Sequence, residues 1–263
     1  MRSVAGDRPP AAALLLAAVA VLFFLLPLAG LVARAPWNDA VGQLSAPESR
    51  LAFQLSLLTS FSATALAVVF GVPLAWLIAR VRFRGRNVLR ALVTLPMVLP
   101  PVVGGVALLL AFGRRGLLGP LLAAAGIHLP FTTAGAVLAE TFVAMPFLVI
   151  TVEAGLRSRD LRYEEAARTL GAGRWYLFRR VTLPLVLPSL LAGSVLCWAR
   201  ALGEFRATIT FAGNFPGTTQ TLPLAVYLEL ETRPDAAIML SLVLLLVSLA
   251  VLVGLRDRWL GAG

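Results

Sequence analysis

The chain offers few side chains that could carry out covalent chemistry. Its 263 residues include one cysteine, Cys197, one histidine, His128, and no lysine. Neither has a neighbour at the spacing of a metal site or of a nucleophile with its base, and Gly-x-Ser-x-Gly and His-Glu-x-x-His motifs are absent. A P-loop needs a lysine on the nucleotide phosphates, so this chain is not a Walker-type ATPase by itself. These observations argue against a membrane-embedded enzyme and predict no metal site.

The polar residues that stand out lie in one loop, residues 157–183, between two apolar stretches. Glu164 and Glu165 stand where the positive N-terminal end of a short helix favours acids. Gly171 suits the left-handed C′ position that ends such a helix. Pro184 suits the first turn of the next helix, where its missing N–H costs nothing. The pattern predicts a capped surface helix, which another protein could approach closely.

The rest of the chain consists of long apolar blocks that must position this loop. Hydrophobic residues make up 59% of the chain and charged residues 14%, against roughly a quarter charged in soluble domains. Apolar runs of about 18 residues or more predict helices that cross a membrane. We therefore expect an all-α polytopic membrane protein with six transmembrane helices, at residues Ala11–Val32, Leu57–Ala79, Val88–Phe112, Ala134–Leu156, Leu183–Leu202 and Ala236–Leu255.

The first block has a second interpretation. Arg2 and Arg8, an apolar run and Ala33-Arg34-Ala35 resemble a secretory signal with its cleavage site. Signal peptides have apolar cores of about 7–15 residues, and this run is longer, which favours a retained helix.

Arginine placement predicts the orientation. With the N-terminus inside, the segments 1–10, 80–90, 157–182 and 256–263 hold 16 of the 23 basic residues. The outside loops hold 6, and Arg200 falls near the end of the fifth span. Since loops rich in arginine stay in the cytoplasm, we expect both termini to be cytoplasmic. The same placement, in short loops between spans, argues against nucleic acid as a partner.

The loop residues also carry a family resemblance. The spacing Glu-Ala-Ala, three residues, Gly, nine residues, Val, one residue, Leu-Pro resembles the EAA loop of ABC importer permeases. The matching positions, with the acid that precedes them, are Glu164, Glu165, Ala166, Ala167, Gly171, Val181, Leu183 and Pro184. The resemblance implies a type I ABC importer permease fold, in which this loop docks on a cytoplasmic ATPase.

Two further stretches resemble the molybdate permease subunit, over nearly the whole chain from about Leu51. They run from Thr94 to Gly116 and from Arg200 to Gly217, and sulfate and tungstate permeases share parts of them. Arg206 departs from the family string, which usually has a small residue there. The candidate residues for a translocation path or gate are Pro96, Pro100, Pro101, Arg200, Glu204, Arg206, Thr208 and Thr210.

Read without the family, the prolines remove N–H donors from the third span. Irregular backbone within a bilayer requires cover by protein or a watery cavity, so the stretch is either a packed kink or a helix that lines a pathway. The threonines from Thr208 onward would offer neutral donors on a mobile loop, and Arg200 and Arg206 would add the positive potential that an oxyanion needs.

Two acids fall inside or near the fourth span. Glu140 has the wrong sign for an anion site, and we expect it to be protonated or paired with an arginine in a structural role. Glu153 lies near the cytoplasmic end of the span, where we expect it to reach the interface.

The resemblance implies a permease subunit that performs no chemistry and moves molybdate into the cell. The alternatives are a related oxyanion, tungstate or sulfate/thiosulfate, or another small solute. The implied partners are a second permease copy, two cytoplasmic ABC ATPase subunits, an extracytoplasmic oxyanion-binding protein and the lipid bilayer. No cofactor is expected on this chain, because ATP and magnesium would bind the ATPase.

We expect one membrane domain in a bacterial cytoplasmic membrane. Residues 1–50 would form an N-terminal helix with an outer loop, residues 51–255 the permease core of five helices, and residues 256–263 a cytoplasmic tail. The loop 157–183 lies within that core.

Overall fold

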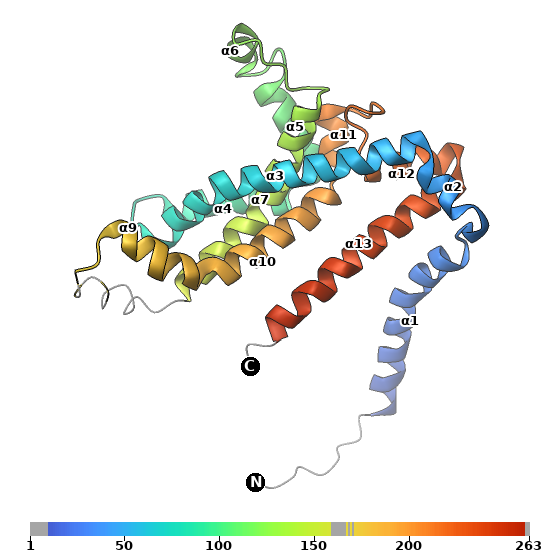
Figure 1. Cartoon of the computed structure of the whole chain (residues 1–263), viewed down its shortest axis with the longest axis horizontal. Coiled ribbons are helices and arrows are strands. Elements are labelled where there is room, and N and C mark those ends of the chain that lie inside the picture. Colours follow the sequence, from blue (N-terminus) through green and yellow to red (C-terminus); the bar gives the residue numbers. More distant parts are fainter. Residues whose placement is uncertain (1–9, 159–166, 168, 170, 261–263) are drawn as a thin grey trace.

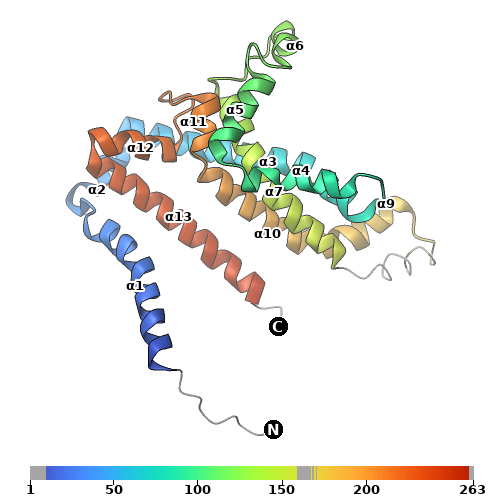
Figure 2. The same cartoon turned by 180° about the vertical axis from the view of Figure 1, so that it is seen from behind.

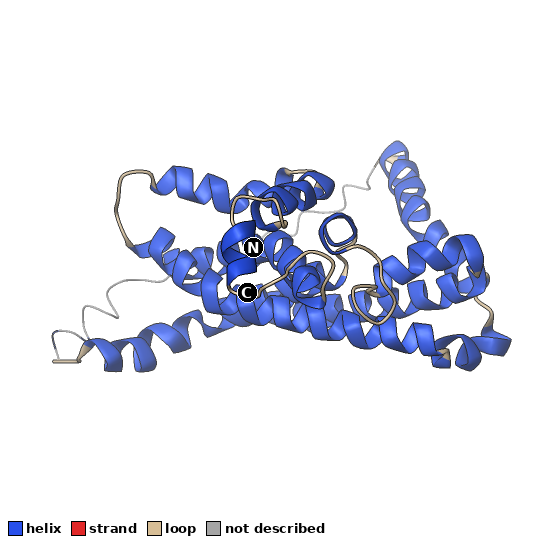
Figure 3. Cartoon of the chain, turned by 90° about the horizontal axis from the view of Figure 1, so that it is seen from above, coloured by secondary structure: helices blue, strands red, loops and turns tan. Residues whose placement is uncertain are grey.

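The computed structural model of the chain describes residues 10–158, 167, 169 and 171–260, and in these ranges it contains helices and no strand (Figure 3). The all-α prediction is confirmed. The helices are α1 (Ala11–Ala33), η1 (Trp37–Asp39), α2 (Ala40–Ser45), α3 (Pro47–Arg80), α4 (Arg86–Val98), α5 (Pro101–Phe112), α6 (Gly119–Ala124), α7 (Thr133–Arg157), α9 (Arg174–Leu177), the π-helical η2 (Phe178–Thr182), α10 (Leu183–Leu202), α11 (Arg206–Ala212), α12 (Leu222–Thr232) and α13 (Pro234–Leu260).

Within the described ranges, five helices are long and apolar enough to cross a membrane, and a bent pair, α4 with α5, brings the number to six if it counts as one span. Four predicted spans match a helix to within a few residues. The second is longer than predicted, because α3 begins at Pro47 rather than near Leu57. Its polar N-terminal end continues as helix where protein covers it: Ser56 is buried, and its Oγ accepts the Leu222 N–H at 2.6 Å.

The predicted third span is not one straight helix. It is divided at Leu99 and Pro100, which both have extended backbone. The helix axis changes direction by 119° between α4 and α5. A residue before proline is pushed out of the helical region, and Leu99 and Pro100 each precede a proline, so two consecutive residues cannot continue α4. A helix of 12 or 13 residues is about 20 Å long, so neither half could span the bilayer by itself.

The core lies around α7, which packs against α3 and α10 (Figures 1 and 2). Small residues on α3 let the helices approach closely. A Cβ at Gly71 would lie 3.0 Å from the Leu148 side chain of α7. Without a hydrophobic drive between helices in lipid, such close contact supplies much of the packing energy.

The helix α1 stands away from this core (Figure 1). Its apolar residues from Leu14 to Val32 are almost all exposed, and only its end packs, with Leu31 and Ala35 against Met239 and Leu242 of α13. An exposed surface of this kind suits a bilayer, which accepts apolar side chains on every face of a helix.

Candidate coupling loop and translocation path

The loop after α7 holds the predicted docking helix. Its first members, Glu164, Glu165 and Ala166, lie outside the described residues. At the helix end, Gly171 has φ +83°, and the Ala172 N–H donates to the Ala167 carbonyl at 3.0 Å. That bond, with a left-handed glycine before it, is the Schellman ending of a helix, so the predicted conformation of Gly171 is confirmed.

The remaining loop residues lead into the fifth span without a break. Val181 lies in the π-helical η2, and α10 begins at Leu183 with Pro184 in its first turn, as predicted. The Leu183 N–H donates to the Phe178 carbonyl, five residues back. Proline removes one helical donor and crowds the preceding turn, and a wider turn at this point keeps α9, η2 and α10 continuous. The part of the loop from Arg174 onward is therefore continuous with the span that follows it, and residues 171–173 before it are not helical.

The broken span has one packed face and one open face. A Cβ at Gly105 would lie 2.6 Å from the Thr210 Cβ of α11, and a Cβ at Gly104 would lie 3.1 Å from the Phe142 ring of α7. On the other side of α5, Val102, Val103 and Val106 are exposed. The two interpretations of this stretch are therefore compatible, since a packed kink also presents a free face. Pro96 is half-buried within α4, Pro100 caps α5 and Pro101 is its first residue.

The first part of the stretch after the fifth span is a helix, so the prediction of a loop is wrong for Thr208 and Thr210, whereas Thr218, Thr219 and Thr221 lie in a non-helical segment. Residues Arg206–Ala212 form α11, whose start is capped by Glu204: the Ala207 N–H donates to its Oε1 at 2.8 Å. A carboxylate at a helix start is stabilised by the free N–H groups of the first turn. Because of this cap, a helix begins at Arg206, only a few residues after α10 ends at Leu202.

The threonine hydroxyls of α11 are not arranged as hydrogen-bond donors toward a substrate path. Thr208 is fully buried and its Oγ1 has no hydrogen-bond partner, while the Thr210 hydroxyl donates to the Arg206 carbonyl at 2.7 Å. Of the two predicted gate threonines, Thr208 packs inside the protein and Thr210 packs on α5.

The two arginines of this region differ in their surroundings. Arg200 Nη2 lies 2.6 Å from Glu204 Oε2, and the Glu204 side chain is 1% exposed. Its charge is therefore balanced by the acid that caps α11. Arg206 is exposed at the start of α11, and the described residues give it no ion pair. Of these two arginines, only Arg206 contributes a positive charge that no described acid balances.

Glu140 lies in the middle of α7 and is 1% exposed. Thr59 donates to its Oε1 at 2.8 Å, and its Oε2 has no hydrogen-bond partner. Of the two predicted alternatives, the arginine pair is absent from the described residues. A neutral carboxyl therefore fits this site better than a carboxylate.

Glu153 is buried and paired near the end of α7. Its side chain is 8% exposed and lies between two arginines: Arg157 Nε is 2.9 Å from its Oε1, and Arg90 Nε donates to its Oε2 at 3.2 Å. The Arg90 Nη2 also contacts Glu153 Oε1. The sequence carries a signal for Arg157, which is four residues away on the same helix. It carries none for Arg90, which lies 63 residues away.

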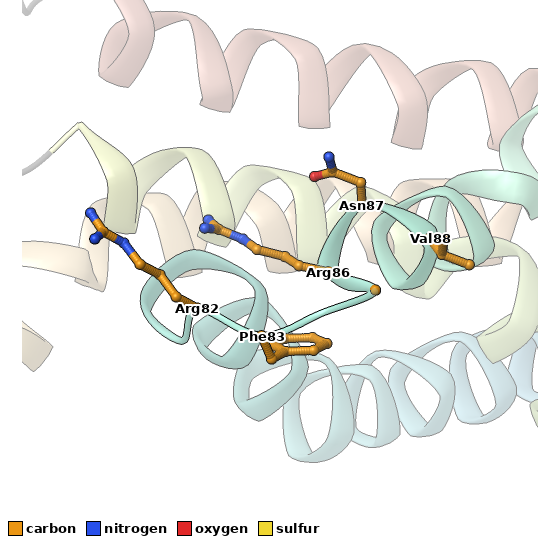
Figure 4. A pocket seen from close by; sticks show the side chains of 6 residues that line it. Arg82, Phe83, Arg86, Asn87 and Val88 are labelled. Carbon is orange, nitrogen blue, oxygen red and sulfur yellow. The ribbon is translucent and has the colours of Figure 1, made fainter.

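The turn between α3 and α4 is basic. Arg82, Phe83, Arg86 and Asn87 surround a shallow hollow there (Figure 4). Arg86 Nη2 donates to the Ala79 carbonyl at 3.2 Å, which ties the start of α4 to the end of α3. A positively charged surface at a span end is the usual pattern of a loop held on the cytoplasmic side.

A helical core with a broken span, and a capped loop joined to the next span, define the class as a polytopic membrane permease. The model of the family described as binding-protein-dependent transport system inner membrane component matches residues 67–262. The chain belongs to this family, and it is a permease subunit of an ABC transport system in the inner membrane.

Relatives within the family are similar over most of their length. The molybdenum transport system permease protein ModB of Mycobacterium tuberculosis is 49% identical over 90% of each chain. The protein of the same name in Escherichia coli is 44% identical over 78% of this chain and 90% of its own. The sulfate transport system permease protein CysT of Escherichia coli is 39% identical over 89% of this chain and 86% of its own.

A solved structure supports the same fold. In the crystal structure of a bacterial alginate ABC transporter with a pentasaccharide-bound periplasmic protein, one chain superposes with a TM-score of 0.73 at 20% identity. The match covers 92% of this chain and 90% of that one, so the predicted permease fold is confirmed.

Proposed function

We propose that this permease carries molybdate into the cell. The observation that supports this most is the 49% identity to a molybdenum permease over 90% of both chains, which is higher than the 39% to a sulfate permease. The related oxyanions tungstate and sulfate/thiosulfate are the second candidates. All are tetrahedral dianions, and weak hydrogen-bond donors with modest positive charge serve each of them.

The transport would be driven by ATP on separate subunits. The loop 157–183, with the residues from Glu164 to Pro184 identified above, would dock on a cytoplasmic ATPase. The continuity of α9, η2 and α10 supports that role, because the second half of the loop would move together with the fifth span. The chain would bind no cofactor itself, since ATP and magnesium would reside on the ATPase.

The working assembly would hold two copies of this chain, two ATPase subunits and an extracytoplasmic oxyanion-binding protein. The open face of α5 supports a second copy, since it exposes valines that a pathway or a partner helix would cover. Both termini would be cytoplasmic. The gate would include the kink at Pro96, Pro100 and Pro101 and the mouth around Arg206.

The proposal is tested by reconstituting the permease with its ATPase and binding protein in proteoliposomes. We expect ATP-dependent accumulation of radiolabelled molybdate, which excess unlabelled molybdate or tungstate suppresses and sulfate suppresses less. Accumulation of sulfate in preference to molybdate would assign the second candidate. Absence of any ATP-dependent oxyanion uptake would contradict the proposal.

A further inference from the structure

Glu153, a buried acid near the end of α7, joins α7 to α4 through an ion pair. Glu153 is reached by Arg157 from its own helix and by Arg90 from α4. One carboxylate with two guanidinium partners is fully compensated, which makes burial of its charge tolerable.

The helix α4 has little else to hold it. None of its 13 residues is buried. Leu89 and Val93 pack against the edge of the core cluster, and Arg86 bonds the end of α3. The contact between Arg90 and Glu153 is therefore the one described ion pair that fastens this half of the broken span to α7.

The position of this contact is the second observation. Glu153 lies one turn before Arg157, the last residue of α7, and the loop with the docking helix follows directly. On the other side, α4 leads into the kink at Leu99 and Pro100 and then into α5, whose Gly105 lies against α11. A displacement at the end of α7 thus reaches the kinked span through Arg90.

We propose that Arg90 and Glu153 form the mechanical link by which movement of the docking loop is passed to the kinked third span. This rests on the proposed function, in which the loop is driven by an ATPase. Both are positioning residues, because neither is placed at the substrate pathway. Arg157 stays on the same helix as Glu153, so it neutralises the acid without joining the two helices.

This geometry gives a matched pair of substitutions. Arg90→Gln removes the bond between helices and leaves Glu153 with Arg157. Arg157→Gln also removes one arginine and leaves the bond between helices intact. If the arginines served only to neutralise a buried charge, the two variants would behave alike.

The experiment measures oxyanion delivered per ATP hydrolysed, with the reconstituted permease, ATPase and binding protein. For Arg90→Gln we expect this ratio to fall about fivefold or more, the lower end of ordinary coupling between sites. For Arg157→Gln we expect a smaller fall in this ratio than for Arg90→Gln. Arg90→Lys, which keeps the positive charge, should retain most of the ratio of the unmodified protein. Arg233→Gln, which breaks a pair of similar geometry with Glu229 at 2.6 Å, is the control and should match the unmodified protein.

An unchanged ratio in Arg90→Gln, or equal losses in Arg90→Gln and Arg157→Gln at equal thermal stability, would overturn the inference. If Arg90→Gln fails to accumulate, the double variant Arg90→Gln/Glu153→Gln removes both charges, and its ratio decides the question in the same way. If the unmodified protein delivers no oxyanion with ATP, the proposed function fails, and that result is distinct from a failure of the link.

Discussion

Four acids lie buried in the described residues, among them Glu229 with its partner Arg233, and the other three differ in their partners. Glu153 has two arginines, Glu204 has Arg200 and a backbone N–H, and Glu140 has only the Thr59 hydroxyl. Removing the partner of a buried charge is costly, whereas an exposed charge can change with little effect on stability. An arginine that pairs with a buried acid is therefore expected to affect stability, whereas an exposed arginine is expected to affect transport only.

Arg200→Ala and Arg206→Ala should therefore give different results. Arg200→Ala leaves the buried Glu204 carboxylate unpaired at the start of α11, which costs about 3–5 kcal/mol. We expect less protein in the membrane and a lower unfolding temperature in detergent. Arg206→Ala should keep both normal and lower the rate of oxyanion uptake, because the mouth loses its unbalanced positive charge. Equal stability of the two variants, or full uptake by Arg206→Ala, would contradict this account.

Gly171 provides a test of the docking loop. At φ +83° a valine is strained by about 1–2 kcal/mol, so Gly171→Val should displace the helix end. Abundance should stay near normal, since the packing of α7 against α3 and α10 holds the protein, while uptake and co-purification of the ATPase are lost. Gly171→Asn is the matched control, because asparagine tolerates this conformation, and it should retain activity.

Glu165→Arg reverses the charge at the other end of the same loop. We expect it to lower ATPase co-purification and stop uptake at near-normal abundance, since losing a charge at a helix start costs only about 0.3–1 kcal/mol. If both Glu165→Arg and Gly171→Val transport normally, the loop is only a linker.

At the scale of helices, the contact between α5 and α11 is the tightest along the broken span. The Cβ of Thr210 lies 2.6 Å from where a Cβ on residue 105 would lie, whereas a Cβ on residue 104 would lie 3.1 Å from the Phe142 ring. A ring can turn aside, but a Cβ moves only with its backbone. A methyl group is therefore expected to be tolerated better at residue 104 than at residue 105.

Gly105→Ala should push α5 from α11 and destabilise the protein by about 1–3 kcal/mol, the usual cost of overpacking. Gly104→Ala should cost less. Thermal unfolding of the two variants in the same detergent measures the difference. A larger loss for Gly104→Ala would show that the two helices do not pack as described.

At the scale of the whole molecule, we expect the bent pair of α4 and α5 to cross the membrane as one broken span. Arg90 near the start of α4 meets Glu153 near the end of α7, and Gly104 of α5 faces Phe142, three turns nearer the start of α7. The path from Arg90 to Gly104 therefore follows α7 in the opposite direction, from Glu153 to Phe142, which is about 16 Å of a helix about 38 Å long. A re-entrant pair would return to the end from which it entered.

Cysteine labelling tests this arrangement. With Cys197 replaced by serine, cysteines at Arg84 and Arg174 should be protected from an impermeant reagent in intact cells, and one at the exposed Pro216 should react. If the pair were re-entrant, Arg84 and Arg174 would lie on opposite sides. Outside labelling at position 174 would refute the topology.

The sequence alone determined the all-α class and the place of four of the predicted spans, because apolar runs of membrane length form helices in lipid. It also determined the conformation at Gly171 and the helix start at Pro184, since glycine and proline restrict the backbone locally. These features depend on neighbours within a few residues, so spacing along the chain is sufficient to predict them.

Only the tertiary structure decided which charges are paired. Arg90 and Glu153 lie 63 residues apart, and nothing in their spacing distinguishes this contact from an exposed acid and a loop arginine. The same holds for Thr59 with Glu140, and for the close approach of Gly105 to Thr210. The 119° bend was implied by the prolines only as a break, and its angle follows from the helices against which α4 and α5 pack. Ion pairs and kinks between helices depend on the three-dimensional arrangement of the spans, which the periodicity of one helix does not contain.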